Sequence, residues 1–313
     1  LPVARDRIES VYVKPSWLPD GRSFTSSRRR PLEPGAAADS AYRFTQAFLH
    51  VLDDEGRILR DSFVFGHGAP GCPAMGPMDF PAVIVPPGST WAIGQVNHGD
   101  ESDVSLWVLP VADLGKSTAR WRPVCTRADL VTDFAVQGDA ISLVTAKEAP
   151  RHKVIRTSLA DPDLTTAETV VPAGAAVVHD VAAAADALYV STSHGPVRHI
   201  LRVPHDQPRN AAAIVMPDDE PSASVAAASP VLPGILVRGG SWIRTGRIHA
   251  FDPKNLELSD TGLVPVGPFD APEGLTATEV LVESHDGVRV PLSIIHRADR
   301  RRDGNAPTIL TGY

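Results

Sequence analysis

The chain is a succession of short apolar segments, four to eight residues long, each bounded by Gly, Pro, Asp or Ser. Segments of this length that are rich in β-branched residues are typical of β-strands. No long window keeps the i, i+3, i+4 apolar spacing of an amphipathic helix. The pattern therefore predicts an all-β fold. The clearest predicted strands are 82–85, 104–111, 140–145, 153–159, 187–193, 198–203, 234–238 and 247–251.

Turn residues recur along the chain with a nearly constant spacing. The turns at Gly88, Gly138, Asp186 and Gly234 follow one another at intervals of about 50 residues. Four strands in about 40–50 residues are typical of a propeller blade, which covers its apolar faces by stacking on neighbouring blades. The sequence thus predicts a β-propeller. Its five readable units are about 8–66, 78–127, 130–172, 176–217 and 221–268, the first lengthened by an insertion near 31–39.

The C-terminal segment has a different pattern. Apolar stretches at 279–283 and 288–296 flank the turn Asp286-Gly287, and a third apolar run at 306–310 follows a polar loop. These stretches are interpreted as the opening strands of another domain. We therefore divide the chain into a propeller at 1–275 and the beginning of a second domain at 276–313.

The amino-acid composition argues against some classes of partner. The formal net charge of −7 and the isoelectric point of about 5.9 disfavour a nucleic-acid partner, which selects a basic surface. No apolar run reaches the roughly 18 residues of a membrane span. Residues 1–10 contain charged side chains and lack the apolar core of a signal peptide. We expect a cytoplasmic location; periplasmic or secreted locations stay open because the natural N-terminus is not seen.

The sequence predicts neither a metal nor another cofactor. Cys72 and Cys125 form no CxxC motif; two free thiols are expected, with a single disulfide as the alternative. There is no HExxH motif and no Cys/His cluster with metal-ligand spacing. Asp100, Glu101 and Asp103 do not match the spacing of an EF-hand calcium loop.

Several motifs, in order along the chain, resemble the prolyl oligopeptidase family. Residues 284–292, followed by Gly312-Tyr313, are similar to the start of the peptidase domain, where a Ser-Lys-Asp-Gly turn precedes a strand ending in Gly-Tyr-Gly-Gly-Phe; His285 replaces the usual lysine. The segment 15–21 resembles the Trp-x-Pro-Asp-Gly blade motif. The segments 133–159 and 246–252 resemble the central and last blades of the family.

The resemblance implies a seven-bladed propeller that covers an α/β-hydrolase domain and limits substrate size. This chain would supply the later five blades and the first hydrolase strands. Family members are serine peptidases that cleave oligopeptides after proline with a Ser-His-Asp triad. The partners implied are a proline-containing oligopeptide and the remaining hydrolase domain of the same protein. The nucleophile motif G-x-S-x-G is absent, and the nearest string, 239–243, is predicted to be a hairpin turn. The chain alone is therefore expected to be inactive.

The resemblance and the residue types indicate six candidate site residues. By resemblance, Tyr313 donates its hydroxyl to the oxyanion of the tetrahedral intermediate; the alternative is packing at a strand end. The loop after the strand 91–96 lacks the arginine and cysteine that the family places near substrate. Its polar residues are either substrate-facing or part of a solvated turn, and the segment 75–80 either lines the same cavity or packs between blades. The substrate-facing candidates are Asn97, His98, Asp100, Met78 and Phe80.

Two other functions stay open. A stand-alone five-bladed propeller would act as a binding module through its loops, and it predicts a closed, monomeric ring. A related acyl-peptide hydrolase or peptide macrocyclase would share the fold and differ in its products.

Overall fold

The computed structural model describes residues 15–31, 34–69, 71–301 and 303–312. Within them lie five four-stranded antiparallel sheets and one two-stranded sheet. In every four-stranded sheet, strands that follow one another in sequence are neighbours in space. The strands of the first three sheets are β1 (Ser16–Trp17), β2 (Ser23–Arg28), β3 (Gln46–Leu52) and β4 (Ile58–Gly66); β5 (Asp79–Ile84), β6 (Trp91–His98), β7 (Val104–Pro110) and β8 (Arg122–Cys125); β9 (Val131–Gln137), β10 (Ala140–Thr145), β11 (Lys153–Ser158) and β12 (Glu168–Val171).

The fourth and fifth sheets follow the same plan. Short 3₁₀ helices occur in the connections, and the described residues contain no α-helix. No helix there is long and apolar enough to cross a membrane. The remaining elements are β13 (Val177–Ala183), β14 (Ala187–His194), β15 (Val197–Pro204) and β16 (Ala212–Ala213); β17 (Ser222–Ala228), β18 (Ile235–Gly240), β19 (Ile248–Asp252) and β20 (Glu257–Asp260); β21 (Leu275–Glu283) and β22 (Arg289–Arg297); η1 (Ala38–Tyr42), η2 (Val111–Asp113), η3 (Arg127–Asp129) and η4 (Pro208–Asn210).

The sheets confirm the predicted propeller architecture. Each predicted unit contains one observed sheet. The second, third and fourth sheets begin and end within a few residues of the predicted limits, whereas the fifth ends at Asp260, before the predicted limit of 268. Three of the turn residues that set the repeat, Gly88, Gly138 and Gly234, have φ values of 74°, 57° and 76°. Only glycine adopts this left-handed conformation without steric cost, which explains why the turn signals were readable from the sequence.

The core consists of apolar layers between successive sheets. Phe65 of β4 packs on Trp121 beside β8, with ring centroids 4.7 Å apart, and fills the space between the first and second sheets. A Cβ atom at Gly94 of β6 would lie 2.7 Å from this phenylalanine ring, so glycine is required for the close approach. Three further layers join the remaining sheets. Cys72 and Cys125 are free thiols in these layers, and burial raises their pKa to about 11 and about 12.

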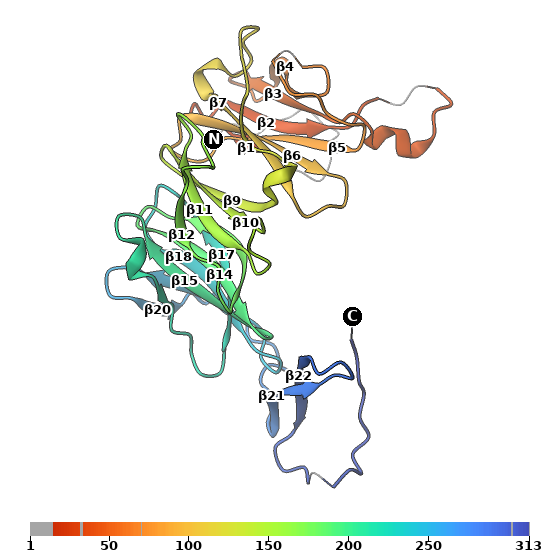
Figure 1. Cartoon of the computed structure of the whole chain (residues 1–313), viewed down its shortest axis with the longest axis vertical. Coiled ribbons are helices and arrows are strands. Elements are labelled where there is room, and N and C mark those ends of the chain that lie inside the picture. Colours follow the sequence, from red (N-terminus) through yellow and green to blue (C-terminus); the bar gives the residue numbers. More distant parts are fainter. Residues whose placement is uncertain (1–14, 32–33, 70, 302, 313) are drawn as a thin grey trace.

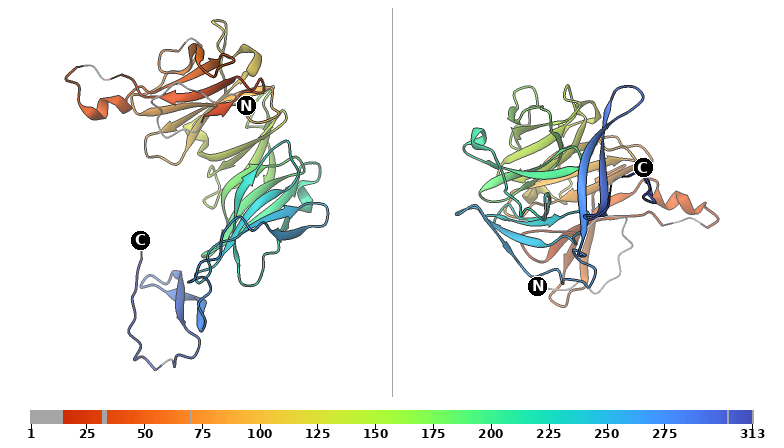
Figure 2. Two further views of the ribbon diagram at one scale, coloured as in Figure 1. Left: turned by 180° about the vertical axis from the view of Figure 1, so that it is seen from behind. Right: turned by 90° about the horizontal axis from the view of Figure 1, so that it is seen from below.

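The five sheets form an open arc. Figure 1 shows the first sheet at one end and the fifth sheet toward the other, and Figure 2 shows the same arc from behind and from below. Each sheet packs on the next, and no strand of the first sheet packs extensively on a strand of the fifth in the described part of the chain. The closed ring expected of a stand-alone five-bladed propeller is therefore not what the structure shows.

The up-and-down order of the strands gives the arc two structurally distinct sides. In every sheet, the connection between the second and third strands lies on the same side as the start of the first strand and the link to the next sheet. The hairpin β21–β22 packs on this side, which we call the hairpin side. The turns between first and second strands lie on the far side. There, Gly88 of the β5–β6 turn lies against Val231 of the β17–β18 turn: an added Cβ would be 2.5 Å from Val231 Cγ1.

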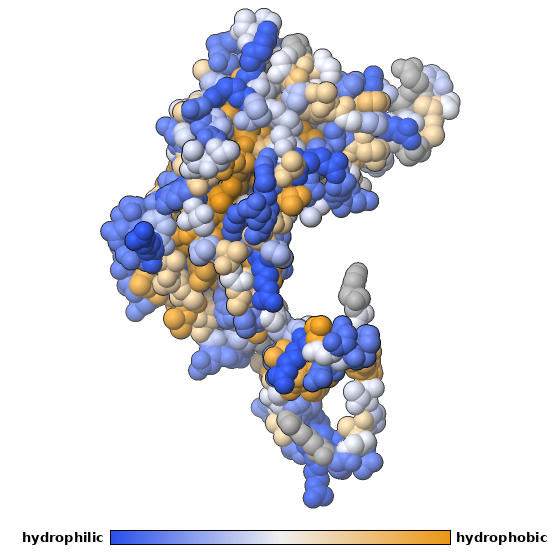
Figure 3. All heavy atoms as spheres, viewed as in Figure 1, coloured by the Kyte–Doolittle hydropathy of each residue, from blue (hydrophilic) through white to orange (hydrophobic). Residues whose placement is uncertain are grey.

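The hairpin β21–β22 is a separate sheet that begins at Leu275. Ala271 donates its backbone N–H to the Ile243 carbonyl (3.1 Å), and Trp242 Nε1 donates to Glu279 Oε1 (3.1 Å). The third apolar run, expected as a strand, has no strand partner among the described residues; Ile309 is 93% exposed. A strand requires a neighbour to pair with its backbone groups, and no described segment lies there to provide one. Figure 3 shows apolar surface on this C-terminal region.

Candidate functional site

The substrate-facing candidates gather at one end of the second sheet, on the hairpin side of the arc. Met78 immediately precedes β5, and the antiparallel register pairs Phe80 with Asn97 and Asp79 with His98. Gly99 donates its backbone N–H to the Met78 carbonyl at 3.1 Å, which holds the β6–β7 loop beside the start of β5. Two segments that are separate in sequence are thus brought together by strand pairing.

The candidates do not share one surface, because successive side chains of a strand point to opposite faces of the sheet. His98 and Asp79 lie on the face that packs against the first sheet, together with Val96. Phe80 and Asn97 lie on the opposite face, which packs against the third sheet through Ile93. The candidates therefore flank this end of the second sheet on both sides.

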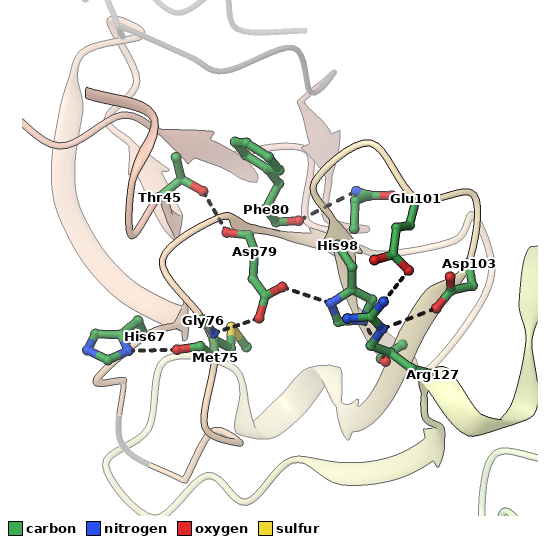
Figure 4. Close-up of polar contacts among 12 residues, drawn as sticks. Thr45, His67, Met75, Gly76, Asp79, Phe80, His98, Glu101, Asp103 and Arg127 are labelled. Carbon is green, nitrogen blue, oxygen red and sulfur yellow. Dashed lines mark hydrogen bonds and ion pairs between the residues drawn. The ribbon is translucent and has the colours of Figure 1, made fainter. Parts of the chain in front are cut away.

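A chain of hydrogen bonds runs through His98. Its Nδ1 lies 2.8 Å from Asp79 Oδ1, and its Nε2 lies 2.8 Å from Ser105 Oγ on β7. The second oxygen of Asp79 accepts the backbone N–H of Gly76 at 2.7 Å. In the tautomer that satisfies all three groups, Nδ1–H donates to the carboxylate and the serine hydroxyl donates to Nε2. Figure 4 shows Asp79 and His98 pointing toward each other from neighbouring strands.

The order Asp79–His98–Ser105 has the connectivity of a nucleophilic triad, but the serine cannot perform that chemistry here. Ser105 is 3% exposed and lies within a central strand of the sheet. A nucleophile must reach a substrate carbonyl, and its oxyanion needs donors beside it. The hydrogen bonds instead hold the β6–β7 loop and the segment before β5 in fixed positions.

The β6–β7 loop is also tied to the segment that connects the second and third sheets. Arg127, in η3 between β8 and β9, forms an ion pair with Glu101 and lies 3.6 Å, Nε to Oδ2, from Asp103. The hydrogen bond from Arg127 lowers the pKa of the Glu101 carboxyl. This arginine occupies the acidic cluster considered above for a cation. Within the described ranges, no group of three or more His, Cys, Asp or Glu side chains has the arrangement of a metal site.

The remaining candidates differ in exposure. Met78 is 48% exposed and Asp100 is exposed at the tip of the loop, so both side chains are accessible to a ligand on the hairpin side. Phe80 and Asn97 are half-buried, and Asn97 Oδ1 accepts a hydrogen bond from Gln95 Nε2 at 3.0 Å. Met75, from the same predicted segment, is buried in the layer between the first two sheets. Tyr313 lies outside the described residues.

Sequence reasoning missed the residues that organise this site. Asp79, Ser105 and Arg127 position the loop, yet they come from two strands and a 3₁₀ helix that are far apart in sequence. The hairpin register would have pointed to Asp79, because residues directly opposite in an antiparallel pair share a face. No local signal identifies Arg127, whose partners lie in the preceding β6–β7 loop.

Comparisons with known proteins find likeness at the level of structure. No protein-family model and no curated protein matches the chain. Among solved structures, prolyl oligopeptidase B from Galerina marginata, bound to a 35mer hydrolysis and macrocyclization substrate, is 19% identical with a TM-score of 0.78; the match covers 95% of this chain and 40% of that one. Oligopeptidase B from Trypanosoma brucei is 17% identical with a TM-score of 0.73, covering 96% and 41%.

A third structure, from a study of two prolyl endopeptidases, is 20% identical with a TM-score of 0.75 and is matched over 94% of this chain. The chain spans about 40% of the length of these proteins. The matched structures belong to the group that the sequence motifs resemble. The chain therefore has the fold of the propeller portion of the prolyl oligopeptidases.

Proposed function

We propose that the chain is the propeller portion of a serine peptidase that cleaves oligopeptides after proline, and that this propeller limits access to the catalytic cavity. The observation that carries the proposal is the position of β21–β22. This hairpin, whose sequence resembles the start of the family's peptidase domain, packs on the same side of the arc as the β6–β7 loop. A catalytic domain that continues from the hairpin would face Met78 and Asp100.

The proposal assigns different steps to different parts of the protein. The Ser-His-Asp triad comes from sequence outside these 313 residues, in which G-x-S-x-G is absent. Tyr313 donates its hydroxyl to the oxyanion. Asp100 and Met78 contact the peptide where it passes the propeller. The fold supports the propeller assignment; proline specificity, gating and these residue roles are the proposed part.

The test is hydrolysis of a quenched fluorescent proline peptide by the complete protein. Loss of a single oxyanion donor lowers kcat by about 10²–10³, so Tyr313→Phe is expected to do so with little change in KM. Tyr42→Phe, the same substitution in η1, serves as the matched control and keeps wild-type kcat. Equal turnover of a peptide with alanine in place of proline, or an unchanged kcat for Tyr313→Phe, contradicts the proposal.

A related activity has a specific observation in its favour. One matched structure is bound to a macrocyclization substrate. Mass spectrometry of the products from a long proline-containing peptide separates the alternatives, because a macrocycle is lighter by one water than the linear product of the same length. Removal of an N-terminal acylated residue would indicate the acyl-peptide hydrolase alternative.

A further inference from the structure

A second cavity on the hairpin side lies outside the site described above. It has a volume of about 420 Å³ and is bounded by the fourth sheet, the fifth sheet and β21 of the hairpin. A volume of this size accommodates one or two amino-acid side chains. Figure 1 shows the hairpin β21–β22 next to the end of the arc that contains the fourth and fifth sheets.

The wall of the cavity is rich in arginine. Arg198 comes from β15, Arg238 from β18 and Arg244 from the loop that follows β18. Glu279 is the acidic residue of the lining, so the charged groups sum to three positive and one negative. Both oxygens of Glu279 already accept hydrogen bonds, from Trp242 Nε1 at 3.1 Å and from Ser293 Oγ at 2.8 Å.

The three arginines differ in their partners. Arg244 Nη2 lies 2.9 Å from Asp219 Oδ2, and Arg198 Nη1 is 4.0 Å from Asp180 Oδ2. For Arg238, by contrast, the described residues supply no ion-pair or hydrogen-bond acceptor to the guanidinium. Such a group at the wall of a cavity is available to an anionic ligand.

The local backbone leaves room for Arg238 and adds hydroxyl groups beside it. Gly246 lies so close that an added Cβ would be 3.3 Å from Arg238 Cγ and 2.5 Å from the Gly239 carbonyl oxygen. Ser224 is the cross-strand partner of Arg238, so the two side chains project from the same face of the fifth sheet. Ser241 Oγ is buried and has no hydrogen-bond partner among the described residues. A buried hydroxyl without a partner is costly unless a ligand or water satisfies it.

We infer that this cavity binds a carboxylate of the peptide substrate through Arg238, supported by Arg244 and the Ser241 hydroxyl. Guanidinium and carboxylate match in charge and in the geometry of paired N–H donors, which makes arginine the preferred partner for this group. The carboxylate comes either from the C-terminus of the peptide or from a Glu or Asp side chain. The inference rests on the proposed function for the nature of the ligand.

The test measures binding in the complete protein, without catalysis. Four fluorescein-labelled peptides that contain N-methylated, uncleavable bonds are titrated by anisotropy: a C-terminal acid and its carboxamide, and an internal Glu peptide and its Gln counterpart. Because the cavity is open to solvent, we expect about tenfold tighter binding of the acid member of one pair. The pair that shows the difference identifies the source of the carboxylate.

Variants assign the preference to the cavity. Arg238→Gln is expected to remove the tenfold difference while leaving the affinity of the neutral peptide unchanged. Arg60→Gln is the matched control, because Arg60 is exposed on β4 of the first sheet, outside the cavity lining. Equal affinity for the acid and neutral members of both pairs overturns the inference, as does a preference that survives in Arg238→Gln combined with Arg244→Gln.

The outcomes distinguish this inference from the proposed function. If the protein cleaves after proline but binds the acid and neutral peptides equally well, the carboxylate site is refuted and the proposed function stands. An acid preference lost in Arg238→Gln, in a protein that cleaves no peptide, keeps the site and removes the peptidase assignment.

Discussion

Asp133 is a half-buried carboxyl group at the junction of the third and fourth sheets. Its Oδ2 accepts the backbone N–H of Val181 at 2.8 Å, which ties β9 to β13. Burial raises the pKa of Asp133 to about 6, and the nearby Asp180 adds to the rise. The folded protein therefore holds this proton more tightly than the unfolded chain does. Its contribution to stability is full below pH 3.8 and is lost as the pH rises through about 6.

Asp133→Asn is expected to remove this pH dependence, because the amide oxygen still accepts from Val181 but no charge forms. The difference in unfolding free energy between variant and wild type should move in favour of the variant between pH 4 and pH 7, by on the order of 2–3 kcal/mol. Urea unfolding of both proteins at several pH values measures it. If the unfolding free energies of variant and wild type change with pH in the same way, the Asp133 carboxyl does not have the raised pKa described above.

The hairpin β21–β22 is joined to the fifth sheet by the hydrogen bond from Trp242 to Glu279. Within the hairpin, Glu279 also accepts a hydrogen bond from Ser293 of the partner strand. Several apolar side chains of the hairpin remain exposed: Leu281, Val282, Val290 and Ile295. Strands that are apolar on both faces are typical of a sheet covered on both sides. The hairpin is thus suited to receive further strands or helices on its open faces.

Glu279→Ala removes both acceptors and should loosen the hairpin. With a net value of about 1 kcal/mol per hydrogen bond, backbone hydrogen–deuterium exchange within 275–283 should become about fivefold faster or more. Glu283→Ala is the matched control, since Glu283 lies exposed on the same strand. If both variants exchange at the wild-type rate, the Trp242–Glu279 contact does not anchor the hairpin.

The positions of the five sheets could be predicted from the sequence alone. Turn glycines with positive φ and a repeat of about 50 residues were enough to place them. Pairing of Asp79 with His98 depends on strand register, which short apolar runs leave open by one residue in either direction. The arginines of the cavity come from two sheets and a loop, so only the folded chain brings them together. The run at 306–310 has strand character but no partner among the described residues, and composition alone could not reveal that.

At the scale of the molecule, the open arc leaves its first sheet without an outer neighbour among the described residues. Phe48 and Phe63 form an aromatic pair there with centroids 5.6 Å apart, and both rings are half-buried. Arg28 covers the Phe48 ring from 4.4 Å. In a closed propeller another blade would lie over such a face.

The isolated chain is expected to associate through the hairpin. Its exposed apolar side chains favour contact between copies, so light scattering should show a mass that increases with protein concentration. Leu281→Ser with Ile295→Ser should reduce this association, whereas Leu59→Ser, at an exposed leucine of β4 in the first sheet, should not. A wild-type chain that stays monomeric at all concentrations would contradict this interpretation of the hairpin.

The contact between Gly88 and Val231 makes the far side of the arc different from the hairpin side. Two turns from opposite parts of the propeller meet at the far side, while the hairpin side carries the Arg127–Glu101 ion pair and the arginine-lined cavity. The second and fifth sheets are therefore in contact through their turns on the far side of the arc, so a larger residue in place of Gly88 should force these two turns apart.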